Sequence, residues 1–176
     1  MWVAAESVET VYYFVLDVPS PVLTAADLFY FGGYIAFFAG LILYFQSFGE
    51  AVNKGRVAKA MIPVALLTIL ALWRIIPLEA AASPSPLATI DGLAFVLLDL
   101  LLVALAALPL AIFAGGTIAK WLVVLCGGSA LYALADVRLV YLGAKGNVQD
   151  GNLAGLLFLL AYLTFALAFY LHRREW

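Results

Sequence analysis

Six ionisable side chains lie within or at the ends of apolar stretches that are long enough to cross a membrane. They are Asp27, Arg74, Asp91, Asp99, Asp136 and Arg138. A charged group in the hydrocarbon core is costly, so such residues either pair inside the protein or mark a site with a function. These six positions are therefore the first places to look for one.

Arg74, Asp99 and Asp136 are the hardest of the six to explain by structure alone. Residues two apart on a helix do not face each other, so Asp136 and Arg138 need separate partners. Arg74 is a natural counter-ion for Asp99 or Asp136, which leaves a structural ion pair and a ligand pocket both open. With nearby tyrosines, these residues predict a ligand-binding set toward one side of the membrane, comprising Asp27, Tyr30, Tyr34, Arg74, Asp99, Asp136 and Tyr162.

Simpler roles are predicted for the charges nearest the ends of the spans. Thr24 precedes Asp27 and Thr89 precedes Asp91, and carboxylates stabilise the first turn of a helix, so both aspartates are expected to act mainly as caps. Arg138 lies close enough to the membrane surface to extend its guanidinium there.

Enzymatic chemistry finds little support in the sequence. The one histidine, His172, cannot by itself supply paired haem ligation or a metal cluster. Ser129 has no histidine at membrane depth to activate it as a nucleophile. We therefore expect no catalytic residue, no metal and no cofactor. The net charge of -2 also gives no basic field for nucleic acid.

The elements that must position these residues are membrane-spanning helices. Hydrophobic residues make up 66% of the chain and charged residues only 11%, which is far outside the range of soluble domains. A span needs roughly 20 mostly apolar residues. Five stretches qualify, near residues 24–48, 58–78, 88–113, 117–142 and 152–172. Short connections predict an all-α integral membrane fold, with a five-helix transmembrane bundle as one domain over residues 21–176.

Residues 1–20 have a different pattern and predict a separate N-terminal segment. Glu6 and Glu9 recur at helical spacing opposite apolar positions such as Trp2, which is typical of an amphipathic helix lying in the membrane interface. The segment has no lysine or arginine, unlike a signal peptide, so we expect it to be retained. Pro19 then ends it.

The placement of basic residues predicts an orientation. Under the five-span interpretation only Lys145 lies in a loop on one side, and the other flanking basic residues gather on the opposite side. These are Lys54, Arg56, Lys59, Lys120, Arg173 and Arg174. The positive-inside rule then predicts a multi-pass protein of the cell membrane, with its N-terminus outside and its C-terminus in the cytoplasm.

Small residues predict where helices approach closely. Gly32, Ala36 and Gly40 lie four apart on the first span, and Gly127 and Gly128 are adjacent on the fourth. Such positions allow close helix packing, either within the bundle or against a second copy or another subunit. The expected partners are membrane lipids and a protein partner or homo-oligomer within the membrane.

Several short motifs recur in a familiar order from Ala25 onward. In sequence they are Ala26-Asp27-Leu28-Phe29-Tyr30 followed by Gly33-Tyr34, Leu72-Trp73, Leu97-Leu98-Asp99-Leu100-Leu101, Leu134-Ala135-Asp136-Val137 and Leu159-Leu160-Ala161-Tyr162. This order resembles the multi-span sensor regions that precede bacterial GGDEF-type diguanylate cyclase domains. The resemblance implies a membrane-embedded sensory module. Arg74 departs from the family pattern, and no GGDEF sequence occurs in the chain, so cyclase activity is not implied.

Two functions of different classes follow from these observations. In the first, the bundle is a sensory or ligand-recognition module with a polar pocket toward the outer side, and it acts through partner proteins. Such a module needs a ligand that binds two states of the bundle with different affinities. In the second, the chain is an accessory or structural subunit of a larger integral-membrane complex. The ordered aspartates and tyrosines favour the first.

Overall fold

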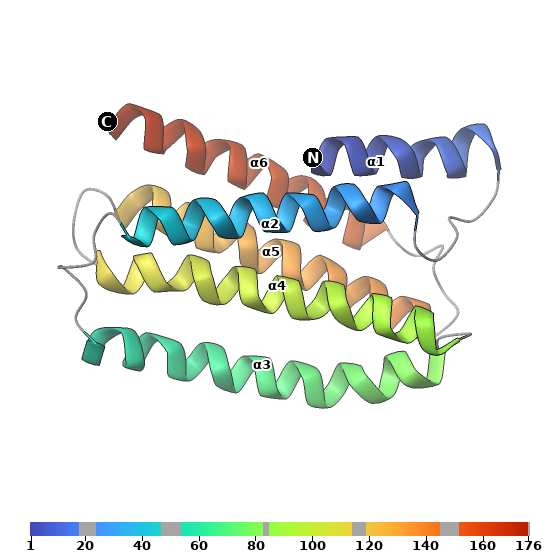
Figure 1. Cartoon of the computed structure of the whole chain (residues 1–176), viewed down its shortest axis with the longest axis horizontal. Helices are drawn as coiled ribbons and strands as arrows, with labels where there is room; N and C mark the ends of the chain where they lie inside the picture. The colour runs from blue at the N-terminus through green and yellow to red at the C-terminus, as the bar shows by residue number, and fades with distance from the viewer. Residues whose placement is uncertain (18–23, 47–53, 83–84, 114–118, 145–151, 176) are drawn as a thin grey trace. The chain divides into compact units, whose positions relative to one another are not determined.

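Every regular element that the structure describes is a helix. The computed structural model describes residues 1–17, 24–46, 54–82, 85–113, 119–144 and 152–175. The elements are α1 (Trp2–Thr10), a short π-helix η1 (Val11–Val15), α2 (Ala25–Gln46), α3 (Lys54–Ala82), α4 (Pro86–Ile112), α5 (Ala119–Ala144) and α6 (Asn152–Glu175), as Figure 1 shows.

Five of these helices are long and apolar enough to cross a membrane. Their apolar stretches are Ala25–Tyr44, Val57–Ala81, Pro86–Leu110, Lys120–Gly143 and Leu153–Arg174. Each approaches or exceeds the roughly 20 residues that the hydrocarbon core requires. The predicted all-α fold with five membrane-spanning helices is therefore confirmed. The interfacial position of the N-terminal segment stays a prediction.

The chain divides into two compact units, Met1–Ser47 and Phe48–Trp176. The first contains α1, η1 and α2, and the second contains α3 to α6. α1 packs on α2, so these two helices fall in one unit. The predicted division into segments 1–20 and 21–176 stays a prediction.

The first unit is a helical hairpin held by a close contact between α1 and α2. The indole of Trp2 covers Gly33 so closely that a Cβ atom at Gly33 would lie 2.5 Å from Trp2 Nε1. Met1 covers Gly32 in the same way, at 3.1 Å. After η1 the chain leaves the helical conformation at Asp17, whose φ of 52° is left-handed, a conformation that aspartate tolerates better than most residues.

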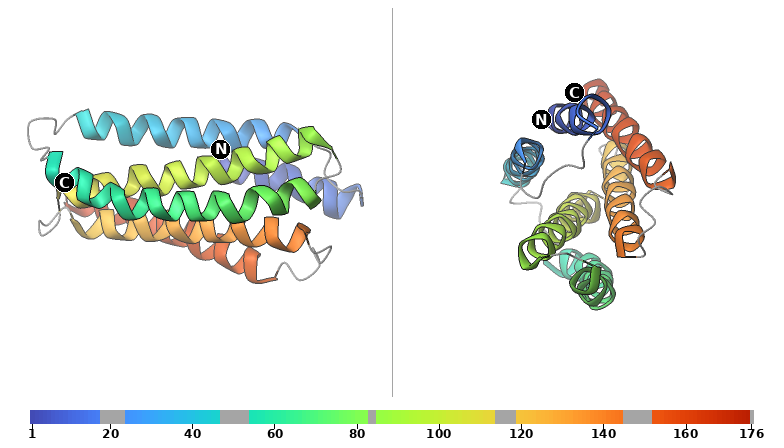
Figure 2. Two further views of the ribbon diagram at one scale, coloured as in Figure 1. Left: turned by 90° about the horizontal axis from the view of Figure 1, so that it is seen from below. Right: turned by 90° about the vertical axis from the view of Figure 1, so that its right-hand side faces the viewer.

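The second unit is built from consecutive helices, each packed on the next. α3 packs on α4, α4 on α5, and α5 on α6, while α3 also contacts α5. Figure 2 shows α5 and α6, in orange and red, running alongside each other. The apolar core of this unit draws on α4, α5 and α6, with its buried residues including Val96, Leu102, Ala106, Leu122, Leu125, Ala161 and Phe165. Many aliphatic side chains also face outward, as lipid-facing helices require.

The start of α4 corrects one prediction from the sequence. Ser85 is the residue before the helix, and its hydroxyl accepts a hydrogen bond from the Ala88 amide at 3.2 Å, with Pro86 in the first turn. Serine before a first-turn proline is a favourable helix start. Asp91 therefore lies beyond the first turn, and the prediction that it caps the helix was wrong.

Candidate functional site

The predicted ligand-binding residues belong to both units. Asp27, Tyr30 and Tyr34 lie on α2 in the first unit. Arg74, Asp99, Asp136 and Tyr162 lie on α3, α4, α5 and α6 of the second unit. That the two groups gather around one ligand stays a prediction.

In the first unit, Asp27 closes the start of α2. Its carboxylate accepts hydrogen bonds from the Thr24 amide and, at 3.1 Å, from the Thr24 hydroxyl. The Thr24 hydroxyl in turn accepts a hydrogen bond from the Ala26 amide at 3.1 Å. This reciprocal arrangement satisfies amides that have no partner within the helix. The predicted capping role of Asp27 is confirmed.

Tyr34 lies in an aromatic cluster of the same hairpin. It is only 1% exposed, and its ring meets the Trp2 ring edge-on at 5.6 Å between centroids. The Phe38 ring lies 5.9 Å from the Tyr34 ring, and Phe37 stacks on Trp2 at 5.8 Å. Edge-on and stacked rings stabilise such contacts beyond their apolar burial. Tyr34 therefore helps to hold α1 on α2, whereas Tyr30 is half-buried.

Glu9 is a residue of the hairpin whose importance the sequence did not reveal. Burial of its carboxyl, with added repulsion from Glu6 and Asp27, raises the pKa of Glu9 to about 7. Both effects disfavour the charged form. The helical spacing of Glu6 and Glu9 placed them on one polar face, but it gave no sign that a neighbouring helix would cover Glu9.

In the second unit, Asp99 is the most deeply buried charged residue among those described. It is 1% exposed and lies about 20 Å along α4 from Pro86, close to the middle of that span. Aliphatic residues flank it on the helix. Asp99 does interact with other parts of the protein. A carboxylate at this depth is a functional candidate by default.

Tyr132, at the contact between α5 and α6, meets Tyr162 and lies one helical turn before Asp136. Tyr132 on α5 is 3% exposed, and its ring meets the Tyr162 ring edge-on at 5.8 Å between centroids. Phe158 is on the same helix as Tyr162, and its ring centroid lies 5.1 Å from that of Tyr132. Asp136 follows Tyr132 by one helical turn and is half-buried. The structure thus places Tyr162 close to the helical face that carries Asp136.

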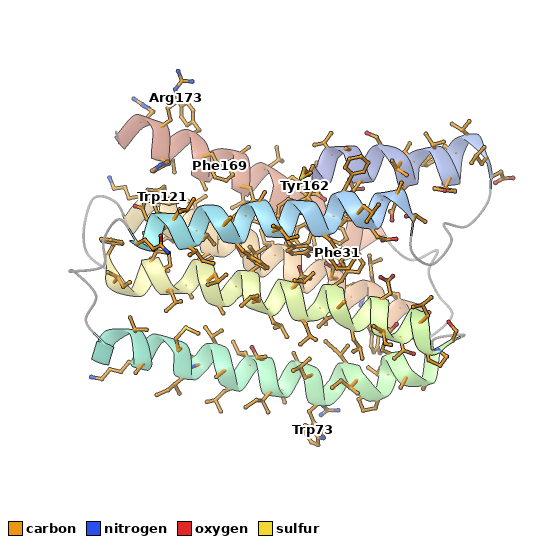
Figure 3. All side chains as sticks on the ribbon, in the orientation of Figure 1. Phe31, Trp73, Trp121, Tyr162, Phe169 and Arg173 are labelled. Atoms are coloured by element: carbon orange, nitrogen blue, oxygen red, sulfur yellow. The ribbon has the colours of Figure 1, made fainter. Side chains whose placement is uncertain are left out.

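Arg74 does not share these buried surroundings. Its side chain is exposed on α3, and Cζ lies 5.4 Å from the centre of the neighbouring Trp73 ring. Trp73 is 68% exposed, and Figure 3 shows it projecting from α3 on the side away from α4. The guanidinium contact that the structure gives is therefore a cation–π contact with Trp73.

Two further contacts join α5 and α6, and each had a signal in the sequence. A Cβ atom at Gly128 would lie 2.9 Å from Phe165 Cδ1, which confirms the predicted close approach at this glycine. Closer to the start of α5 and the end of α6, the rings of Trp121 and His172 lie 4.5 Å apart. Both residues are near the ends of consecutive antiparallel helices, and that arrangement was the available signal for their contact.

The described residues contain no group of three or more His, Cys, Asp or Glu side chains that could hold a metal ion. The fold and the intraspan charges together define an all-α protein with five helices suited to crossing a membrane. Comparison with known proteins found no matching protein family, curated protein or solved structure.

Proposed function

We propose that this protein is a non-enzymatic membrane module that recognises a ligand through polar residues of its spans and acts through partner proteins. The observation that carries this proposal is the buried carboxylate of Asp99 near the middle of α4. Keeping a carboxylate at that depth costs free energy that an apolar side chain would not. A role in recognition gives a reason for that cost.

The tyrosines near Asp136 support the same proposal. Tyr132 and Tyr162 are amphipathic, with an apolar ring and a hydroxyl that can donate or accept a hydrogen bond. Side chains of this kind suit a small molecule with both apolar and polar parts. Movement of α6 against α5 would change the contact between these two rings, and such a movement is one route by which binding is passed to a partner.

The orientation and the family are part of this proposal. The basic last turn of α6, with His172, Arg173 and Arg174, favours a cytoplasmic C-terminus and hence an external N-terminus. The resemblance to sensor regions of GGDEF-type proteins suggests that the partner is a signalling protein on the cytoplasmic side.

The test is native purification of the wild-type protein and of Asp99→Asn in nanodiscs, followed by mass spectrometry of retained small molecules. Asparagine keeps the shape of the side chain and removes its charge. We expect a small molecule that is retained by the wild type and falls at least about tenfold in Asp99→Asn, as the loss of a charged hydrogen bond predicts. Circular dichroism and gel filtration should be unchanged.

Leu97→Ala is the matched control, because Leu97 is exposed on the same helix and should retain the molecule. If Asp99→Asn loses its helical structure or aggregates while no molecule is found with the wild type, Asp99 is structural and the recognition role is wrong.

A second candidate function is an accessory subunit of a larger membrane complex. The observation that favours it is the exposure of α3 in the second unit, where most side chains of its apolar stretch face outward. Recovery of the protein in a complex of fixed stoichiometry, with no retained small molecule, would favour this function over the first.

A further inference from the structure

We infer that the face of α3 carrying Trp73 and Arg74 is the docking surface for a transmembrane helix of a different protein, one that bears an aspartate or glutamate at matching depth. This inference rests on the proposed function to the extent that both require a partner protein. It goes further by naming the surface and the chemistry of the partner.

Arg74 lies inside the apolar stretch of α3 and not at its end. The apolar stretch of α3 ends at Ala81, so the Cα atom of Arg74 lies about 10 Å inside that end at 1.5 Å per residue. The side chain is exposed on the outside of the second unit. A guanidinium on a lipid-facing surface at this depth is unfavourable unless it reaches the headgroups or meets an opposite charge.

The geometry of the helix sets the direction in which the Arg74 side chain leans. Side chains on a helix lean toward its N-terminus, and for α3 this means away from Ala81 and toward the middle of the membrane. The Cζ atom of Arg74 lies 5.4 Å from the centre of the ring of Trp73, the preceding residue. Reaching the nearer headgroups would require the side chain to turn back, whereas an opposite charge within the membrane can be met in the direction in which the side chain leans.

A second copy of this chain is not the natural occupant of this face of α3. Within the spans that the structure describes, the carboxylates are buried or half-buried and none is exposed on the surface. They are Asp27, Glu79, Asp91, Asp99 and Asp136. A second copy would therefore have to expose one of these to reach Arg74, whereas a different protein can present a carboxylate directly.

The surroundings of Arg74 suit a helix. Leu66, Leu70 and Trp73 recur at spacings of four and three residues, and all are exposed. They form one continuous stripe with Arg74 at its outer end. Aromatic and arginine side chains are the ones that most often dominate protein interfaces, and the Trp73 ring already orients the guanidinium.

The test places a photoreactive benzoylphenylalanine at Leu70, on this stripe, in the full chain in its native membrane. The comparison position is Leu163, which is exposed on α6. We expect the Leu70 probe to give one crosslinked polypeptide whose attached peptide has an Asp or Glu within an apolar span. Arg74→Gln should lower the yield roughly tenfold, as loss of one partner of a desolvated charge pair does. Arg74→Lys should retain most of it.

A charge exchange completes the test. Arg74→Glu should abolish the crosslink, and the reciprocal change of the partner's carboxylate to arginine should restore it. Crosslinking to lipid alone, to a second copy or to another segment of this chain would overturn the inference, as would a yield that Arg74→Gln leaves unchanged. If the Leu163 probe captures a partner and the Leu70 probe does not, this surface is wrong but a partner-dependent function survives. If neither captures another protein, both fail.

Discussion

Protonation of Glu9 is coupled to the packing of α1 on α2. The packed hairpin holds the carboxyl in a partly buried position beside Glu6 and Asp27, and this raises the pKa of Glu9 from 4.5 to about 7. At pH values between 4.5 and about 7, the packed state binds more protons than a state in which α1 has separated from α2. Packing is therefore strongest below about pH 4.5, weakens as the pH rises to about 7, and then levels off.

Hydrogen exchange of the α1 amides, corrected for the intrinsic effect of pH, measures this coupling. Protection should fall between about pH 4.5 and pH 7 in the wild type, and Glu9→Gln should remove most of that dependence because glutamine does not titrate. Glu6→Gln is the informative second variant. It removes one repulsive charge, so the fall should shift toward lower pH. An unchanged profile in Glu9→Gln would assign the coupling to another group.

Individual residues also show what the sequence could and could not indicate. Thr24 and Asp27 were predictable as a cap because the pattern alone specifies the hydrogen bonds. The same reasoning failed at Thr89 and Asp91, because Ser85 with Pro86 offers a better start one turn earlier. Glu9 could not be identified because burial depends on which helix covers it, and a single sequence does not say so.

At the scale of helices, Gly128 decides how closely α5 and α6 approach. A methyl group there would lie 2.9 Å from Phe165 Cδ1 and 3.3 Å from Thr164 Cγ2. Phe165 is 5% exposed and lies 6.4 Å from the Tyr132 ring between centroids, so it has little room to move. Gly33 has the corresponding role beneath Trp2 in the hairpin.

Gly128→Ala should therefore destabilise the α5–α6 contact by about 1–3 kcal/mol, the usual cost of overpacking. Gly127→Ala is a matched control, because a Cβ atom at Gly127 meets no atom within 4 Å. It should be neutral or slightly stabilising, since alanine is the better helix former. Reversible unfolding in detergent micelles measures both. Equal stability of the two variants would show that Phe165 can move aside.

The glycine pattern predicted close helix approach but not its details. Gly32, Ala36 and Gly40 made up the seam that the sequence predicted. In the structure, however, a Cβ atom at Gly40 meets nothing within 4 Å, and Gly33 has a closer contact than Gly32. A spacing of four selects one face of a helix. It does not determine how far along that face the neighbouring helix extends.

For the whole molecule, hydropathy was sufficient to predict the number of spanning helices, because the length of a span is set by the membrane. It was not sufficient to place the predicted ligand-binding residues together. Arg74, a natural counter-ion for Asp99 or Asp136 by sequence, is exposed on α3, and its Cζ atom lies 5.4 Å from the centre of the Trp73 ring. Distances between residues on different helices depend on rotation about each helix axis, and apolar sequences specify that rotation weakly.

The orientation can be measured with single cysteines in a Cys126→Ser background and a maleimide that does not cross membranes. Leu153→Cys at the start of α6 should react in intact cells, because the N-terminal end of this helix is expected outside. Lys120→Cys at the start of α5 should react only after permeabilisation. The opposite pattern would place the N-terminus in the cytoplasm and reverse the expected sides of the ligand and partner.

The contact between Trp121 and His172 provides an internal optical reporter. Indole emission depends on the groups that pack against the ring, and the Trp121 and His172 rings lie 4.5 Å apart where α5 begins and α6 ends. In a variant that retains Trp121 as its only tryptophan, the emission should change when these two helix ends separate. Separation of α5 from α6 at the side expected to face the signalling partner can therefore be followed by tryptophan fluorescence, with no attached dye.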